Sequence, residues 1–313
     1  MCLIALAIDQ QRRFPLVLAA NRDEFFDRPS ARLSWWQPDT GGPAILGGRD
    51  LHAGGTWLGL NAQGRLALLT NVRRPGPHDA SAPSRGTIVP LWLKGDQPPD
   101  RFWMQVALSG HNPFNLIAAD FRIGECYWAS SEVAAPRRLG KGIFGLSNAS
   151  LNTPWPKVER LKAQMAAALE ECDSVAAISD HLFAALADSA AAKDADLPRT
   201  GILIEQERLL SSAFIRTPDK RYGTRCSTLL ITERVGRRLV THMIERTFPF
   251  DGGAALLRQA RLRDWPPRYT VEAPRDVTPG PVSDGDDEPP AADTLKRTRV
   301  RGLLRPAILR RRA

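Results

Sequence analysis

The sequence predicts an α+β protein in which two β-sheets lie between layers of helices. Three observations predict this class. Short apolar runs typical of strands dominate roughly the first 75 residues, apolar residues at helical spacing follow residue 153, and strand-like runs return beyond residue 200. Strands, then helices, then strands again favour a layered fold, because the apolar face of a sheet has to be covered by another layer.

Two short apolar runs open the chain, at residues 3–8 and 16–20. Both are shorter than an ordinary helix and are typical of buried strands. The segments 55–60 and 65–70 flank a Gly-containing turn, so they predict a β-hairpin.

The middle of the chain alternates between predicted helices and strands. Residues 75–86 are rich in Pro and Gly and predict a loop. Helices are expected over 86–94 and 100–109, and a strand pair over 115–120 and 125–129.

A strand is expected over 142–147, and Thr153-Pro154 then predicts the start of a helix, with Thr as cap and Pro in the first turn. Apolar residues at helical spacing continue it, which indicates a core-facing stripe: Val158, Leu161, Met165 and Leu169. The remaining predicted elements are a helix over 175–187 and strands over 209–217 and 226–247.

The net charge of +9 is concentrated at the C-terminal end. Eight basic and no acidic residues lie between Lys296 and Arg312, which leaves a net charge of only +1 for residues 1–295. A nearly neutral body argues against a dedicated nucleic-acid-binding function. A basic tail can still contact nucleic acid or anionic lipid without specificity.

Residues 266–313 differ from the rest of the chain. Prolines cluster there, and residues 284–288 form an acidic run, so this segment is expected to be disordered and residues 1–265 to form a single domain. The basic end allows two interpretations. It is either a short amphipathic helix on a surface or a solvated tail.

The cysteines indicate reduced thiols and a cytoplasmic protein. They are widely spaced, at Cys2, Cys126, Cys172 and Cys226, and neither they nor the five histidines have zinc-like spacing. We therefore expect no metal and no cofactor. The apolar run 3–8 is too short for a membrane span and lacks the flanks of a secretory signal, so no transmembrane segment is expected.

Cys2 is the strongest candidate for chemistry. Removal of Met1 would leave a thiol and a free α-amine on one residue, and their ordinary pKa values of about 8.5 and 7.7–8.0 allow proton exchange near neutral pH. The alternative is a small apolar residue at a frayed terminus.

Five further blocks accompany Cys2 along the chain. They lie at residues 21–24 (Asn-Arg-Asp-Glu), 54–59, 69–73, 145–148 and 222–228. With these blocks the sequence resembles the NRDE family, also called the transport-and-Golgi-organisation-2 family. The resemblance implies a four-layer αββα fold of the N-terminal-nucleophile (Ntn) hydrolase type, with two mainly antiparallel sheets, related to penicillin V acylases and conjugated-bile-acid hydrolases. Eukaryotic members are associated with haem trafficking and with lipid or coenzyme A metabolism.

The resemblance also implies a catalytic set around Cys2. Arg22 and Asp23 lie where related acylases carry a supporting polar pair, and Asn71 ends a strand as their oxyanion-hole asparagine does. Asn148 resembles a second, orienting asparagine, and Arg225 a late arginine of the charge network.

Three other residues have less defined roles. Asn21 is expected either to contact substrate or to cap the strand end, and Glu24 to pair with a nearby arginine. Trp57 could line a substrate pocket or pack the hairpin. Three of the catalytic candidates also have a simpler interpretation: Arg22 and Asp23 as solvated surface groups, and Asn71 as a turn former. Cys226 has no adjacent base and is interpreted as a buried structural thiol.

Three functions follow from these features. The first is a cysteine hydrolase of Ntn type that cleaves a carbon–nitrogen amide, or a thioester, in a small molecule through an acyl-Cys2 intermediate. The second is a non-catalytic carrier of haem, acyl-coenzyme A or another hydrophobic ligand on the same fold. The third is a scaffold that acts through its basic tail.

Overall fold

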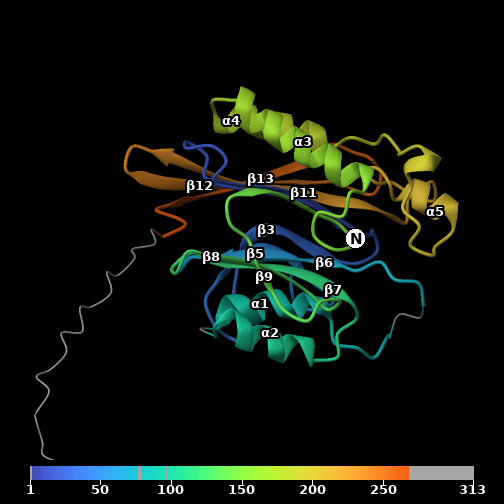
Figure 1. The fold of residues 1–313 in the computed structure, drawn as a ribbon, viewed down its shortest axis with the longest axis horizontal. Helices are drawn as coiled ribbons and strands as arrows, with labels where there is room; N and C mark the ends of the chain where they lie inside the picture. Colours follow the sequence, from blue (N-terminus) through green and yellow to red (C-terminus); the bar gives the residue numbers. More distant parts are fainter. Residues whose placement is uncertain (1, 77–78, 96, 268–313) are drawn as a thin grey trace, which may run out of the picture. The chain divides into compact units, whose positions relative to one another are not determined.

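The computed structural model describes residues 2–76, 79–95 and 97–267. Apart from Pro266 and Pro267, the segment predicted to be disordered lies outside the described residues. Two antiparallel sheets face each other between two helix layers, which confirms the predicted α+β class and four-layer arrangement (Figure 1).

The first sheet carries the N-terminus in its interior. Its order is β10 (Gly142–Leu146), β1 (Cys2–Ile8), β2 (Leu16–Phe25), β11 (Tyr222–Val235), β12 (Arg238–Thr247) and β13 (Leu256–Arg263). Strand β1 pairs with β10 from Ile4 onward and with β2 along its whole length, so its first residue, Cys2, is paired with Arg22 of β2.

The second sheet is a meander. Its order is β3 (Ser30–Trp36), β4 (Ile45–Asp50), β5 (Leu58–Asn61), β6 (Arg65–Asn71), β7 (Phe114–Asp120), β8 (Glu125–Ser130) and β9 (Arg137–Arg138). The predicted hairpin is β5–β6, whose turn contains Gly64 at a φ of 107°, a value that glycine adopts readily.

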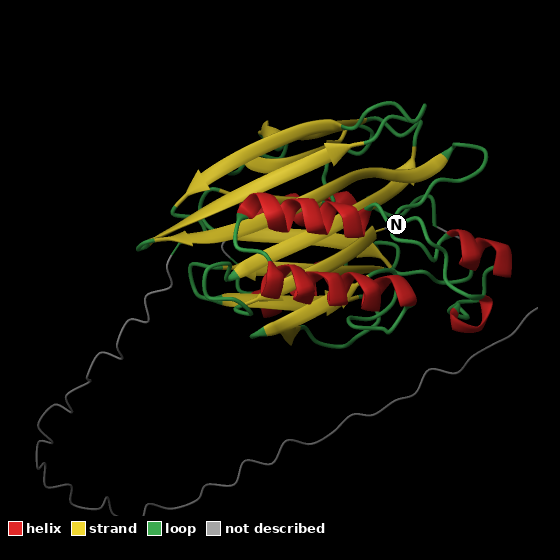
Figure 2. Cartoon of the chain, turned by 90° about the horizontal axis from the view of Figure 1, so that it is seen from above, coloured by secondary structure: helices red, strands yellow, loops and turns green. Residues whose placement is uncertain are grey.

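The outer layers are helical. Helices α1 (Ile88–Lys94) and α2 (Pro99–Ala107) pack on the second sheet, and α3 (Pro156–Glu171) and α4 (Val175–Leu186) pack on the first. Figure 2 shows α3 and α4 side by side across the strands. A short helix, α5 (Ile204–Leu209), precedes β11.

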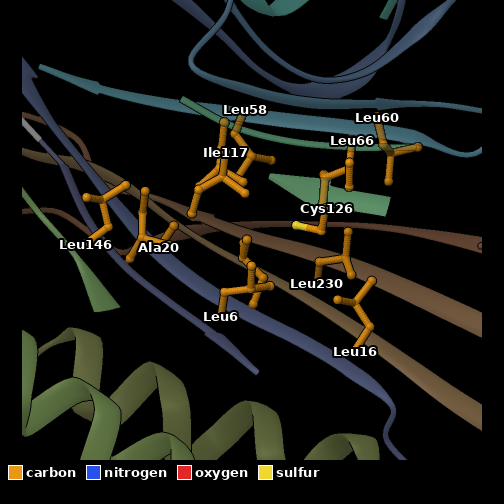
Figure 3. Packing of buried hydrophobic residues seen from close by; sticks show 14 of the residues in the cluster. Leu6, Leu16, Ala20, Leu58, Leu60, Leu66, Ile117, Cys126, Leu146 and Leu230 are labelled. Atoms are coloured by element: carbon orange, nitrogen blue, oxygen red, sulfur yellow. The ribbon is translucent and has the colours of Figure 1, made fainter. Parts of the chain in front are cut away.

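Strands β1 and β2 are apolar on both faces because both faces are covered. Side chains alternate along a strand, so Leu6 and Leu18 face the second sheet, whereas Leu3 and Val17 face α3 and α4. Figure 3 shows the first of these cores, in which Leu6 lies among residues from both sheets.

The predicted stripe on α3 is confirmed. Its four apolar residues are buried against the first sheet, but the start of the helix differs from the prediction. Trp155 is the N-cap and Pro156 opens the helix, while the Thr153 hydroxyl donates to the carbonyl of Ser150. A proline is favourable in the first turn, and here the second Pro of the segment takes that place.

Two expectations in the last third were wrong. Residues 209–217 do not form a strand, because the chain leaves α5 there and makes only an isolated bridge at Arg216. Strand β13 was not expected. Leu256 and Leu257 at its start are half-exposed, and of its apolar residues only Ala260 and Leu262 pack against the core.

Candidate active site

Cys2 is a fixed residue and not part of a frayed end. It pairs with Arg22 on β2 and is only 9% exposed, and its carbonyl accepts a hydrogen bond of 2.9 Å from the Ser147 hydroxyl. Burial raises the pKa of the Cys2 thiol in the chain that retains Met1.

Alternation along β2 divides the tetrad 21–24 between two faces. Arg22 and Glu24 continue the series that faces the second sheet, as Cys2 does on β1, and Asn21 and Asp23 continue the series that faces the helices. The side chains of the motif therefore point to two faces of the sheet, although Asp23 still reaches the cavity that Arg22 and Glu24 line.

A cavity of about 470 Å³ opens beside Cys2. Five of the eight predicted site residues line it: Cys2, Arg22, Asp23, Trp57 and Asn71. The remaining charged residues of its wall are Glu24, Arg28, Asp50 and Arg85. Of these four, the sequence analysis considered only Glu24.

Arg22 lies in the middle of a charged group on this wall. Its Nη2 is 3.7 Å from Glu24 Oε2 and 3.9 Å from Asp50 Oδ2, and its guanidinium carbon lies 4.2 Å from the Trp57 ring centre. Its Nη1 is buried and has no hydrogen-bond partner among the described residues. Arg28 forms a 2.8 Å ion pair with Asp50, and its Nε is 4.0 Å from Glu24, so the expected pairing of Glu24 with arginine is confirmed.

Asp23 is held on the helix-facing side. Its Oδ1 accepts a hydrogen bond of 2.7 Å from the Thr224 hydroxyl, and its backbone carbonyl accepts one of 3.1 Å from Tyr222. Burial raises the pKa of the Asp23 carboxyl, while nearby positive charge, including that of Lys157, acts in the opposite direction.

Lys157, on α3, is a buried charged residue outside the cavity wall but within electrostatic range of Asp23, and it was not among the predicted site residues. It is 2% exposed, its Nζ donates to the carbonyl of Leu210 at 2.9 Å, and burial lowers its pKa to about 8. A signal was present in the sequence, because Lys157 stands four residues before Leu161 and therefore on the buried stripe.

Asn71 and Asn148 lie together at the ends of β6 and β10. The Asn148 amide donates to the backbone carbonyl of Asn71 at 2.9 Å, and its Oδ1 accepts from Ser147 at 3.2 Å. Asn71 lines the cavity, whereas Asn148 lies behind it and joins the two strand ends.

Two further predicted residues, besides Asn148, lie away from the cavity wall. The Asn21 amide donates to the carbonyls of Leu186 and Ala213 at 2.8 and 2.9 Å, which places it against the helix layer. Arg225 Nη1 donates to the carbonyls of Phe25 and Arg28 at 2.6 and 3.0 Å and so holds the chain between β2 and β3. In the structure both side chains make structural contacts.

Cys226 fits its interpretation as a structural thiol, since it is buried and burial raises its pKa well above the ordinary value. Among the described residues, no group of three or more His, Cys, Asp or Glu side chains is arranged to hold a metal ion. No helix in that part of the chain has the length and apolar character needed to cross a bilayer.

Comparison with solved structures finds weak matches. A Caenorhabditis elegans N-acylethanolamine-hydrolyzing acid amidase ortholog matches with a TM-score of 0.39 and 10% identity, covering 74% of this chain and 92% of that one. The C2A mutant of a Clostridium perfringens conjugated bile acid hydrolase matches with a TM-score of 0.38 and 9% identity, covering 87% and 99%. Neither likeness assigns a role to a residue of this chain.

Sequence comparison is more specific. Over 254 residues the chain is 35% identical to the human Transport and Golgi organization protein 2 homolog, covering 75% of this chain and 90% of the human protein. The Drosophila melanogaster Transport and Golgi organization protein 2 is 36% identical over 99 residues, which cover 28% and 33%. A family model described as Transport and Golgi organisation 2 matches residues 1–249. This chain therefore belongs to the Transport and Golgi organisation 2 family, as the NRDE tetrad predicted.

Proposed function

We propose that the protein is an N-terminal-cysteine hydrolase that cleaves an amide, or a thioester, through an acyl-Cys2 intermediate. The observation that supports this most is the position of Cys2. It lies at the start of an interior strand and on a cavity wall, directly opposite Arg22. A nucleophile has to be both fixed and reachable, and few terminal residues are both.

Removal of Met1 is the activating step in this proposal. Burial, together with the negative charges of Asp23 and Glu24, raises the pKa of the thiol, so the unprocessed chain has a poor nucleophile. A free α-amine on Cys2 supplies a base with an ordinary pKa of about 7.7–8.0 next to the sulfur. Asp23, buried beside this end of β1, is the group that would hold the resulting ammonium.

The proposed reaction has two halves. Cys2 Sγ bonds to the substrate carbonyl carbon while its proton passes to the α-amine, and the Asn71 side-chain amide donates to the oxyanion. The ammonium then returns the proton to the leaving nitrogen or sulfur as that bond breaks. Water next attacks the acyl-Cys2 thioester, the amine takes its proton and passes it to the departing thiolate, and the acid product leaves.

Other predicted residues act indirectly in this proposal. Arg22 favours the thiolate by its charge, and Trp57 fixes the guanidinium of Arg22. Asn148 and Arg225 are positioning residues, because one holds the strand end of Asn71 and the other holds the end of β2. We place this activity in the cytoplasm, where thiols remain reduced.

Trapping the intermediate tests the proposal. The full chain is mixed with short-chain acyl thioesters and aryl amides, quenched in acid, and digested for mass spectrometry. We expect an acyl mass on the Cys2 peptide, sensitive to hydroxylamine and absent in Cys2→Ala, with Cys172→Ala as the matched control. Acylation that persists in Cys2→Ala would overturn the proposal. No acylation, together with tight binding of haem or acyl-coenzyme A, would favour the carrier function instead.

A further inference from the structure

The charged groups on the cavity wall are largely compensated. Arg28 pairs with Asp50, and Glu24 lies between Arg22 and Arg28 at 3.7 and 4.0 Å. If Cys2 carries a free α-ammonium, as the proposed function requires, Asp23 is compensated as well. These groups therefore leave little net charge on the wall.

Arg85 is the exception. It precedes α1, lines the same cavity as Cys2, and its Nη1 donates to the carbonyl of Pro113 at 3.0 Å. Among the described residues, no carboxylate lies within ion-pair distance of its guanidinium, and its Nε and Nη2 make no hydrogen bond there. One edge of the guanidinium, with two parallel donors, is thus without a partner.

The surroundings of Arg85 show that its charge acts on its neighbours. Burial lowers the pKa of Arg85, as does the charge of Arg28, whereas the negative charge of Glu24, and of Cys2 as a thiolate, raises it, so these groups lie within electrostatic range of one another. Burial and then the charge of Arg85 lower the pKa of His111. On the same wall, Arg22 carries an Nη1 that is buried without a hydrogen-bond partner in the described structure.

We propose that Arg85 makes the cavity selective for acyl compounds that carry a carboxylate, which it binds through its Nε–Nη2 edge. The proposal rests on Cys2 as the nucleophile. Two parallel N–H donors match the two oxygens of a carboxylate, and a lysine could not reproduce this geometry. A monoanion matches this site better than a phosphate dianion, because the other charged groups of the wall compensate one another and Arg85 supplies a single positive charge.

Two nearly isosteric alkylating reagents test this inference. Iodoacetate and iodoacetamide both form a carbon–sulfur bond with a thiolate and release iodide, and they differ in the charge of the group that Arg85 would bind. At each cysteine we divide the rate of reaction with iodoacetate by the rate with iodoacetamide. The readout is this ratio at Cys2 divided by the ratio at partly exposed Cys172 in the same sample. We expect this relative ratio to be about ten. A factor of about ten corresponds to the free energy that one charge-assisted hydrogen bond contributes.

Variants of Arg85 separate the effect of its guanidinium on this ratio from the electrostatic potential of the other charged residues in the cavity. Arg85→Gln should lower the relative ratio by about tenfold, and Arg85→Lys should recover part of it. Both reagents attack the same thiolate, so any effect of the Arg85 charge on the Cys2 pKa cancels in this ratio. Arg74→Gln is the matched control, since Arg74 is exposed and pairs with Glu132. A ratio that is the same in Arg85→Gln and in the unmodified protein overturns the inference.

If Cys2 reacts with neither reagent, that result would count against the proposed function and not against the anion site. A binding measurement then tests the anion site by itself. Hexanoylglycine and hexanoylglycinamide are titrated calorimetrically into the Cys2→Ala protein, with and without Arg85→Gln. We expect the acid to bind about tenfold more tightly than the amide, and only when Arg85 is present. Equal binding of the two compounds contradicts the inference.

Discussion

The two faces of β2 near its end carry polar residues with opposite properties. Toward the helices, Asn21 has satisfied hydrogen bonds to two buried carbonyls. Toward the second sheet, Arg22 has a buried Nη1 without a partner among the described residues and lines a cavity. Adjacent residues of one motif thus serve packing on one face and a potential reaction on the other. A motif of this kind should not be interpreted as a single unit.

The largest effect that this comparison predicts is on stability, at the helix-facing side. Asn21→Ala leaves the buried carbonyls of Leu186 and Ala213 without their donor. We expect the free energy of unfolding, measured with urea, to fall by about 3 kcal/mol. Gln10→Ala, which removes one exposed hydrogen bond, is the control. A fall no larger than that of the control would show that Asn21 is not a structural residue.

Lys157 predicts a pH dependence on the same side. Its pKa is lowered by burial from 10.5 to about 8, so the folded protein binds fewer protons than the unfolded chain between these values, and the free energy of unfolding rises with pH there. Lys157→Met should remove about 2 kcal/mol of that rise between pH 8 and 10. Lys162→Met, on the same helix but at the surface, should leave it unchanged. An identical slope in Lys157→Met would contradict a lowered pKa.

On the cavity side, a substitution of Arg22 should change the reactivity of the Cys2 thiol. Arg22→Gln removes the positive charge nearest to Cys2 on the paired strand, so the thiol pKa should rise. We expect the iodoacetamide rate at Cys2, measured at pH 7.5 by peptide mass spectrometry, to fall about tenfold. The rate at Cys172 in the same sample reports any difference in reagent concentration between samples. An unchanged rate would mean that Arg22 does not support the thiolate.

The smallest predicted effect concerns the contact of Trp57 with Arg22. A guanidinium 4.2 Å from the ring centre should contribute about 1 kcal/mol of coupling. A double-mutant cycle with Trp57→Leu and Arg22→Gln, read from urea unfolding, isolates this energy. Coupling near zero would leave Trp57 as a packing residue of the hairpin, the simpler of the two roles that its sequence allowed.

Much of the fold could be predicted because its signals are local. The run at residues 3–8, the hairpin around Gly64 and the stripe on α3 each depend on neighbouring residues, and all three are confirmed. Strand β13 could not be predicted in this way. Its first four residues are all exposed and alternation is confined to residues 260–263, so the local signal is weak and the pairing with β12 forms the strand.

The site shows the same limit. Cys2 lies opposite Arg22 once the two short strands β1 and β2 pair. Asn71 and Trp57 line the same cavity as Cys2, in agreement with the expectation that these residues lie together. Arg85 reaches this wall from a Pro- and Gly-rich segment in which a single arginine carries no signal. The motif places Asn21 next to the site in sequence, but it does not show which way the side chain points. Alternation along β2 turns that side chain toward the helices.

The most direct test of the central claim is brief alkylation of the native full chain near neutral pH, followed by mass spectrometry of the N-terminal peptide. The account predicts that Met1 is absent and that Cys2 is labelled faster than partly exposed Cys172, although Cys2 is buried. Retention of Met1 would contradict the account, because the α-amine could not act as the base. Labelling of Cys172 ahead of an unreactive Cys2 would contradict it equally.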